Sequence, residues 1–286
     1  MTFIESVKGD SNKITLKKYD PPSSELLITD QDCIKIAFLD TETTGIDRAN
    51  DQIIEIAIKM VAFETTSGKI LSIERAYESF NDPEEDISTE ITFLTGIDNK
   101  MVDGVSLDWD MVDGLLEEAD LIVAHNAGFD RAFVDRYSSI SPKKIWACSI
   151  SDIDWLARGF TSSKQELLCY WHGFYFDAHR AMNDVDALIH LLTHEPDDGE
   201  RALIELINNS NLPEYVIFAE HFKYDPVKKD ILKGNKYKWN PSDKIWFKKV
   251  NLDDLENEKD WLTATIYDQI FKERVEEVNP IDKYKL

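Results

Sequence analysis

The sequence predicts an α/β protein in which a mixed sheet flanked by helices is followed by a second, smaller α+β domain. Two observations lead to this fold class. Apolar, β-branched runs of strand length alternate along the chain with segments whose apolar residues recur at helical spacing, as in mixed α/β domains. The turn-rich, charged stretch Glu-Pro-Asp-Asp-Gly at residues 195–199 then separates two regions of different composition. Because domains usually hold about 100 to 200 residues, a chain of 286 residues accommodates both.

This division gives three parts: an N-terminal extension over residues 1–30, a first domain over residues 31–197 and an accessory domain over residues 198–286. The extension is polar and ends in a turn-rich stretch at residues 20–24. We expect that it either adds a strand to the first domain or stays mobile.

Three strands open the first domain, at residues 34–39, 53–63 and 70–80, and their short connections predict a meander. An acidic, helix-prone segment follows and leads to a short apolar strand at residues 121–124. Two later segments carry apolar side chains at helical spacing, one beginning near Asn126 and one ending the domain at residues 182–194.

The first of these strands ends in two acidic residues, Asp40 and Glu42, within the segment Asp-Thr-Glu-Thr-Thr-Gly. Successive side chains on a strand point to opposite faces, so these two carboxylates point the same way. Like charges so close together are unfavourable unless a cation holds them, and Mg²⁺ or Mn²⁺ takes oxygen ligands of this kind. Asp, Thr and Gly are also ordinary turn residues, so this segment alone is equally compatible with a polar turn.

The formal net charge is −23, which is extreme for a protein that binds nucleic acid, since phosphate binding normally depends on clustered Lys and Arg. Any contact with nucleic acid must then be local or mediated by cations. The acidity is alternatively a matter of solubility alone. The acidic surface or the C-terminal domain could also dock a protein partner.

Cysteine usage and hydropathy predict a cytoplasmic protein. The three cysteines are an odd number without metal-type spacing, which predicts reduced thiols. The chain has no run of about 18 apolar residues and no apolar stretch at its N-terminus, so we expect no membrane association and no secretion.

The accessory domain contains a basic and aromatic segment. Between Lys223 and Lys249 there are nine lysines and three aspartates, interleaved with aromatic residues. Two aromatic runs flank residues 240–243, which predicts a hairpin with a four-residue loop. Such a segment can track a nucleic-acid backbone and stack bases, or its aromatics can form the core of a small domain whose lysines are solvated.

Two further segments add charged side chains to the pair on the first strand. Asp130 lies in the first turn of a predicted helix that directly follows a strand. Within a helix, five positions are about 140° apart, so His179 and Asp184 can share a site only if His179 precedes the last helix of the domain. Asp184 lies on the apolar face of that helix, whereas Asp186 points roughly opposite. Asp184 is therefore the candidate ligand, and we expect Asp186 to be solvated.

Asp40-x-Glu42, the segment His-Asn-x-x-Phe-Asp that ends at Asp130, and His179-x4-Asp184 together resemble the three motifs of the DEDD superfamily of 3′-to-5′ exonucleases, in its His-containing branch. This family includes the proofreading subunit of bacterial replicative DNA polymerase and ribonuclease T. The resemblance covers roughly residues 33–194. It implies a ribonuclease H-like fold, two divalent cations (Mg²⁺ or Mn²⁺) and a nucleic-acid substrate with a free 3′ end, with DNA favoured over RNA.

The resemblance also implies roles for individual residues. The residues implied to hold the metals are Asp40, Glu42, Asp130 and Asp184. His179 is implied to be the general base. The residues that match positions lining the pocket of the terminal nucleotide are Thr43, Ile46, Leu94, Thr95 and Phe129. Thr95 departs from the histidine that some relatives have at this position.

The chemistry suits these residue types, since two cations can stabilise both the attacking and the leaving oxygen of a phosphodiester. Four carboxylates roughly neutralise two divalent ions, and an imidazole can take a proton from water near neutral pH. The alternative from another class is a non-catalytic protein that retains the exonuclease fold and binds nucleic acid or a protein partner.

Overall fold

The computed structural model describes residues 15–20, 32–195, 199–223, 225–267, 271–272 and 274–285. The chain divides into two units. The first comprises Met1–Ser210 together with Tyr284–Leu286, and the second comprises Asn211–Lys283. The end of the chain belongs to the first unit because Tyr284 packs against one of its core clusters.

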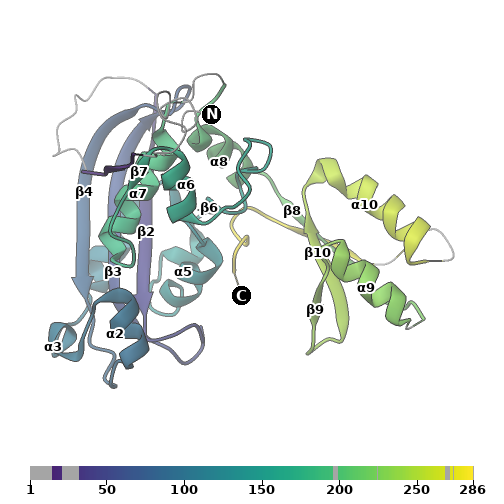
Figure 1. Ribbon diagram of the computed structural model, residues 1–286, viewed down its shortest axis with the longest axis horizontal. Helices are drawn as coiled ribbons and strands as arrows, with labels where there is room; N and C mark the ends of the chain where they lie inside the picture. Colours follow the sequence, from purple (N-terminus) through teal and green to yellow (C-terminus); the bar gives the residue numbers. More distant parts are fainter. Residues whose placement is uncertain are drawn as a thin grey trace. The chain divides into compact units, whose positions relative to one another are not determined.

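The first unit is built on a five-stranded sheet in the order β4-β3-β2-β5-β6 (Figure 1). Its strands are β2 (Cys33–Thr43), β3 (Ile53–Glu64), β4 (Ile70–Phe80), β5 (Leu121–Ala124) and β6 (Trp146–Cys148). The first three pair antiparallel, as the predicted meander, whereas β5 and β6 continue the sheet in parallel to β2. The predicted mixed sheet is confirmed. β2 is longer than the predicted strand because β3 pairs with it as far as Thr43.

Helices cover both faces of this sheet. One face carries α6 (Gln165–Trp171), α7 (Ala181–Thr193) and α8 (Ala202–Ser210), and the other carries α4 (Trp109–Glu118) and α5 (Ala127–Val134). Three short helices lie in the connections: α2 (Thr89–Thr95), α3 (Asn99–Val102) and the 3-10 helix η1 (Ser141–Lys143). None of the helices within the described ranges is long and apolar enough to cross a membrane.

The alternation of side chains along β2 decides which helices its residues meet. Ile36 and Phe38 belong to the core cluster under α7, and Ala37 and Leu39 belong to the cluster under α4 and α5. Because the side-chain period of a strand is two, Asp40 and Glu42 continue the α7 face and Thr41 continues the α5 face.

The boundary between the units lies later in the chain than the predicted one. The predicted boundary, between residues 197 and 198, falls on residues 196–198, which lie outside the described residues. The structure assigns α8 to the first unit because its side chains Leu203 and Leu206 are fully buried in the same core cluster as α7. The apolar face of α8, which follows the turn-rich stretch, thus packs on the core of the first unit. The second unit starts only at Asn211.

The described part of the N-terminal extension adds a strand. β1 (Lys17–Lys18) pairs in parallel with β7 (Phe174–Tyr175), and the two form a separate sheet. The ring of Tyr19 stacks on His190 of α7 with centroids 4.4 Å apart. Residues 1–14 and 21–31, which include most of the predicted extension, lie outside the described residues.

The second unit is a four-stranded antiparallel sheet in the order β11-β8-β10-β9, with two helices among its described residues. Its elements are β8 (Glu214–Ala219), α9 (Pro226–Gly234), β9 (Lys238–Asn240), β10 (Ile245–Val250), α10 (Leu252–Thr265) and β11 (Val275–Val278). The predicted hairpin is present, since β9 and β10 pair across residues 241–244.

Some of the aromatic residues in this unit form its core, as one of the two interpretations of the basic segment expected. Tyr237 and Trp246 are buried in the core cluster, and Tyr237 stacks on Trp261. Trp239 is 46% exposed, and Phe247 is half-buried outside that cluster. Tyr224 lies outside the described residues.

Candidate active site

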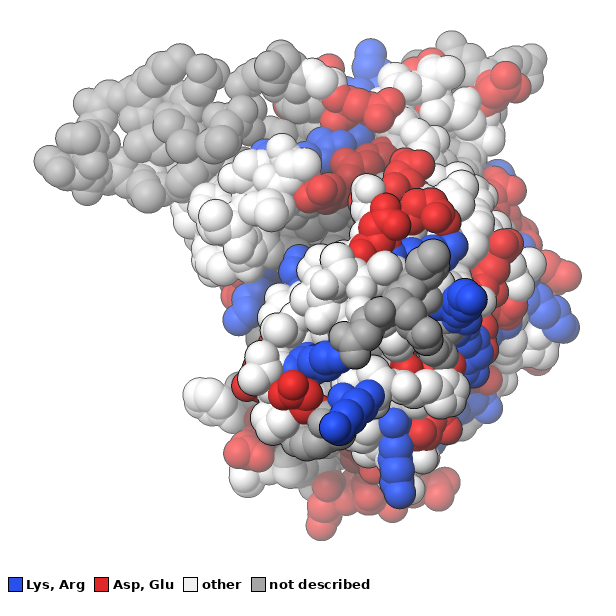
Figure 2. All heavy atoms as spheres, turned by 90° about the vertical axis from the view of Figure 1, so that its right-hand side faces the viewer, with Lys and Arg blue, Asp and Glu red and all other residues white. Residues whose placement is uncertain are grey.

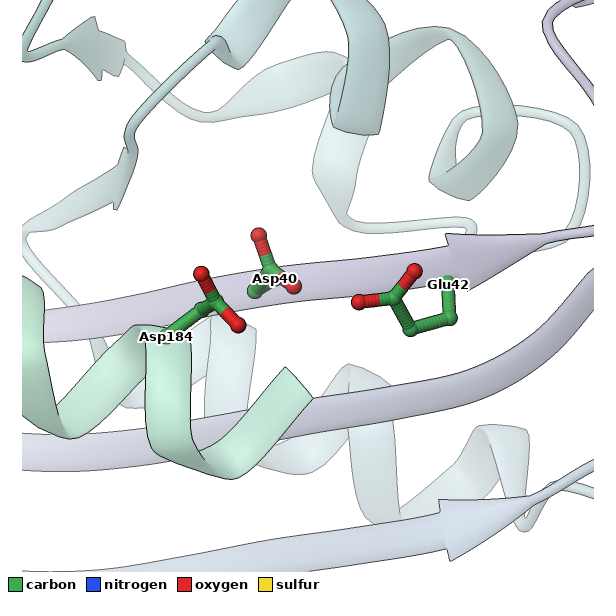
Figure 3. A group of neighbouring side chains, drawn as sticks. All are labelled: Asp40, Glu42 and Asp184. Atoms are coloured by element: carbon green, nitrogen blue, oxygen red, sulfur yellow. The ribbon is translucent and has the colours of Figure 1, made fainter. Parts of the chain in front are cut away.

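Three carboxylates meet over the carboxyl end of β2. Ligand oxygens of Asp40, Glu42 and Asp184 all lie within 4.8 Å of one another. Figure 3 shows Asp40 and Glu42 on the strand and Asp184 reaching toward them from the first turn of α7. The strand period places the first two on the α7 face, and α7 packs flat on that face, so Asp184 meets them. The register between β2 and β3 shifts at Glu42/Thr43, where β3 has one extra residue, and this shift interrupts the regular ladder beside the site.

Burial and mutual repulsion raise the pKa values of these acids. The pKa of Glu42 is raised to about 8, first by desolvation and then by the charge of Asp184. Desolvation raises the pKa of Asp184 to about 7. The pKa of Asp40 lies well above its usual value because of desolvation and the charge of Asp130. Such a group is stabilised either by protons or by bound cations.

Asp130 approaches from the other face of the sheet. It lies on α5, is 3% exposed, and its Oδ1 accepts hydrogen bonds from the backbone N–H of Thr41 (3.0 Å) and from the Thr41 hydroxyl (2.8 Å). Desolvation raises its pKa to about 7, and the hydrogen bonds from Thr41 oppose this shift. Asp130 is thus close enough to act on the charge of Asp40, but it does not belong to the three-carboxylate group. Asp130 is separate from this group because α5 lies on the face of the sheet opposite to α7.

His179 lies in the loop directly before α7, as the helical geometry required. Its side chain is exposed, and its backbone N–H donates a 2.8 Å hydrogen bond to Oδ2 of Asp184. Its φ of 65° is in the left-handed region, which non-glycine residues seldom adopt and which is enriched at functional sites. Asn183 donates from its side-chain amide to the carbonyl of Asp177 (2.9 Å), which holds the same loop. The helix start therefore fixes the backbone of His179 and leaves the imidazole accessible.

Sequence reasoning missed a buried ion pair beside these acids. Glu55 on β3 is the register partner of Glu42, and its carboxylate is fully buried. It accepts hydrogen bonds from Arg180 (Nη2, 2.8 Å) and from the backbone N–H of Ala181 (2.9 Å). Glu55 thereby ties the first residues of α7 to the sheet. An acidic residue among the apolar residues at the start of this strand was the available signal, since a buried charge requires a partner.

The expectation that Asp186 is solvated is wrong. Asp186 is 8% exposed and forms an ion pair with Lys59 of β3. α7 lies flat on the sheet and buries more of its circumference than one apolar stripe, so the position opposite the predicted face still meets β3. Asp186 is outside the three-carboxylate group, and Asp184 remains the ligand candidate.

The five predicted nucleotide-pocket residues differ widely in exposure. Ile46 and Leu94 are 87% and 51% exposed, and Phe129 is half-buried. Thr43 is buried and donates its hydroxyl to the carbonyl of Gly45 (2.6 Å).

Thr95 is also buried, and its hydroxyl serves to end α2. It donates to the carbonyl of Ile91 (2.9 Å) and accepts from the N–H of Ile97 (3.1 Å). The neighbouring Phe93, which sequence reasoning did not select, is 93% exposed. A large apolar side chain that is exposed to solvent is a candidate surface for a base or sugar ring.

The donor set fits divalent cations. Three carboxylates that face one another, with pKa values raised by desolvation and by their own charges, are oxygen donors of the kind that Mg²⁺ and Mn²⁺ prefer. No histidine or cysteine enters the group of possible ligands among the described residues, which disfavours a zinc-type site there.

Comparison with known proteins identifies a family for this chain. A family model described as exonuclease (RNase T) matches residues 37–192, more than half of the chain, and this range includes all five residues of the predicted catalytic set.

Curated relatives include the PolC-type DNA polymerase III of Caldanaerobacter subterraneus subsp. tengcongensis, 41% identical over 97 residues, which covers 33% of this chain and 6% of that protein. The PolC-type DNA polymerase III of Bacillus subtilis is 30% identical over 165 residues, which covers 54% of this chain and 11% of that protein. The chain thus matches only a small part of the length of these relatives.

Solved structures that match this chain include the zinc-bound complex of E. coli ExoI with single-stranded DNA, with a TM-score of 0.49 and 16% identity over 64% of this chain and 48% of that one. Exonuclease X in complex with 5′ overhanging duplex DNA has a TM-score of 0.43 and 23% identity over 59% of this chain and 99% of that one.

Proposed function

Because this chain belongs to the exonuclease family, we propose that it removes nucleotides from the 3′ end of a nucleic acid by metal-dependent hydrolysis of phosphodiester bonds. The observation that carries this proposal is the group of three carboxylates, Asp40, Glu42 and Asp184, with oxygens within 4.8 Å of one another. A group of like charges at a strand end has no structural benefit, whereas it suits cations that bind phosphate.

The acids are proposed to hold two divalent cations, Mg²⁺ or Mn²⁺. The proposed ligands are Asp40, Glu42, Asp130 and Asp184. When bound, the cations would stabilise the negative charge on the attacking and leaving oxygens. The hydrogen bonds of Asp130 with Thr41 and of Asp184 with the N–H of His179 hold these carboxylates in place before substrate arrives.

His179 is proposed as the general base that accepts the proton of the attacking water. Its imidazole is exposed, so the ring is accessible to substrate. Its backbone N–H is bonded to Asp184, which keeps the residue beside the carboxylates. An imidazole suits this role near neutral pH. Ile46, Leu94, Phe129 and the newly identified Phe93 would contact the terminal nucleotide, with Thr43 shaping the turn beside it.

DNA is the favoured substrate, with RNA as the second candidate. The support for DNA is that the curated relatives are DNA polymerases. A pocket for one terminal nucleotide distinguishes the two through the 2′ position.

The test is a nuclease assay on 5′-labelled DNA and RNA, single-stranded and duplex, with Mg²⁺ or Mn²⁺. We expect a ladder of products shortened from the 3′ end, which disappears in excess chelator and in Asp184→Asn. The matched control is Asp186→Asn on the same helix, which removes a buried acid outside the carboxylate group and should retain cleavage. Cleavage that persists in chelator or in Asp184→Asn would refute the proposal. Metal binding without cleavage of any of these substrates would favour the non-catalytic alternative.

The role of His179 needs a different measurement. His179→Ala should lower kcat by roughly 10²- to 10⁴-fold, the usual contribution of a general base, and should flatten the rise of rate with pH. A pH profile that keeps its shape in this variant would exclude His179 as the base.

A further inference from the structure

The second unit has a chain order of strand, helix, strand, strand, helix, strand, and its sheet order places the first and third of these strands, β8 and β10, in the middle. Both helices pack on one face of the sheet. The core cluster of this unit contains Ile217 of β8, Trp246 of β10, Leu232 of α9 and Leu262 of α10. Among the described residues, this cluster takes side chains from one face of β8 and β10 only, because alternate residues of each strand point the other way.

The face without helices carries a row of four side chains across the sheet. Phe247 of β10 is the register partner of Phe218 on β8 and of Lys238 on β9. On the far side, Arg274, directly before β11, accepts a hydrogen bond at its carbonyl from the N–H of Phe218 (3.1 Å) and places its guanidinium 3.8 Å from the centroid of the Phe218 ring. Two aromatic rings on the two central strands are therefore flanked by a cation on each side.

These side chains are accessible to different extents. Lys238 and Arg274 are exposed, and Phe247 is half-buried. Phe218 is 8% exposed, in keeping with the guanidinium over its ring. Arg274 also pairs with the carboxylates of Glu276 (2.9 Å) and Glu220 (3.7 Å), so a phosphate must compete with these two acids for the guanidinium, whose side chain is 45% exposed.

The local charge differs from that of the whole chain. Residues 223–249 contain nine lysines and three aspartates, although the formal net charge of the chain is −23. Lys238 takes part in none of the ion pairs found among the described residues. Figure 2 presents the side of this unit that α9 and α10 cover, and several Lys and Arg side chains lie close together in its lower half.

We propose that the helix-free face of this sheet binds single-stranded nucleic acid, with one base stacked on Phe247, a second on Phe218 in place of the Arg274 guanidinium, and with Lys238 and Arg274 contacting phosphates. Aromatic side chains stack bases of any identity, and flanking cations follow the backbone. Four-stranded sheets that carry aromatics on their central strands recognise single strands in this way. The site lies in the unit that the proposed exonuclease chemistry does not use, and it requires no turnover.

A single strand fits this face better than a duplex. Stacking on two rings of a flat sheet requires unpaired bases, which a duplex keeps in its own stack. A protein partner would not need two adjacent rings with a cation at each end of the row. The two rings and the two cations thus match the two repeating chemical groups of a nucleic-acid strand, base and phosphate.

The test measures binding of the full chain to fluorescent single-stranded DNA and RNA oligonucleotides of about 12 nucleotides by anisotropy. Excess chelator prevents the proposed hydrolysis. We expect Phe247→Ala to weaken binding about tenfold, as loss of one stacked base does. The matched control is Trp239→Ala, which removes a half-exposed ring on the adjacent strand that points to the helix-covered face with Trp246. It should change affinity less than twofold.

The charge contribution is measured by salt dependence. Lys238→Gln should reduce the slope of log affinity against log salt concentration by about 0.7, the value for one phosphate contact on a single strand. Lys244→Gln in the hairpin loop removes an equal charge outside the row and should leave the slope nearly unchanged.

Equal affinities of Phe247→Ala and the wild type, or an equal loss in Trp239→Ala, would overturn the proposal, provided that circular dichroism shows both variants folded. A nuclease that cleaves 3′ ends but binds these oligonucleotides without dependence on Phe247 would retain the proposed function and refute this inference. Binding that depends on Phe247 in a protein that cleaves none of the substrates would support this inference and refute the proposed function.

Discussion

Buried acids in the two units have opposite surroundings: donors in one unit and other acids in the other. In the second unit, Glu258 is 8% exposed and is surrounded by donors: Asn235 and Tyr237 at 2.9 Å and Lys248 at 2.5 Å. In the first unit, the carboxylates at the end of β2 face one another and raise one another's pKa values. The difference teaches that Glu258 stabilises its fold through its own partners, whereas the acids of the first unit repel one another unless the proposed cations bind.

Glu55 lies between these two situations. It is a fully buried acid in the first unit, but it has Arg180 and the N–H of Ala181 as partners. Its charge still raises the pKa of Glu42 across the sheet. We interpret it as a positioning residue, since it ties the start of α7 to β3 and thereby supports Asp184.

The largest expected effect is that of Asp40→Asn, which should lower activity but raise stability in the absence of metal. Asp40→Asn should lower the rate of nucleotide release by on the order of 10³-fold, because a ligand of the proposed cations is lost. In chelator, the same variant should unfold at a higher temperature than the wild type, because one of the repelling charges is gone. The measurements are a nuclease assay and thermal unfolding followed by circular dichroism. A variant that is both inactive and less stable in chelator would show that Asp40 supports the fold instead.

Glu258 should show the opposite behaviour. Glu258→Ala should lower the free energy of unfolding by about 3 kcal/mol, because Lys248 and Tyr237 lose their acceptor in a buried setting. Urea unfolding followed by tryptophan fluorescence measures this change. Glu256→Ala on the same helix is the control, since Glu256 is exposed and its pair with Lys259 should contribute at most about 0.5 kcal/mol. Equal losses in the two variants would remove the contrast between the units.

Replacement of the intermediate acid should have a smaller effect on catalysis. Glu55→Gln should lower kcat about tenfold, because a neutral amide holds Arg180 and the start of α7 less firmly and a displacement near the site is costly. The concentration of metal for half-maximal rate should rise as well. Glu74→Gln, an exposed acid on the adjacent strand β4 that pairs with Lys35, should leave both quantities unchanged. An unaltered kcat in Glu55→Gln would limit this residue to a structural role.

The smallest effect is the pH dependence of stability without metal. The folded-state pKa of Glu42 is about 8 and those of Asp130 and Asp184 are about 7, above the usual values for unfolded chains. Acids with raised pKa values bind protons more strongly when folded, so stability is lost as pH rises through these values. In chelator, the melting temperature should therefore be about 3 °C higher at pH 6.5 than at pH 8.

Saturating Mg²⁺ should flatten this dependence, because bound cations replace the protons. Below about pH 6.5 the increase of stability with falling pH should weaken. Burial lowers the pKa values of His125 and His172 to about 4, so these histidines bind protons more weakly in the folded than in the unfolded chain, which favours unfolding as the pH falls. A melting temperature in chelator that falls from pH 8 to pH 6.5 would contradict the repulsion inferred for the site.

Much of the site could be predicted from the sequence because it depends on local periodicity. The two-residue period of a strand puts Asp40 and Glu42 on one face, and the 3.6-residue period of a helix requires His179 to precede α7 while Asp184 lies within it. Short-range geometry of the backbone is sufficient for such statements, and the structure brings three of these acids together as expected.

The tertiary structure alone decided which distant side chains meet. The pairing of Glu55 with Arg180, the burial of Asp186 against Lys59 and the attachment of Asp130 to Thr41 each join elements far apart in the chain. These contacts depend on strand register and on how much of a helix the sheet covers, which a single sequence does not display. The row of Lys238, Phe247 and Phe218 likewise exists only because three strands pair in register, since backbone hydrogen bonds between strands are what align side chains across a sheet.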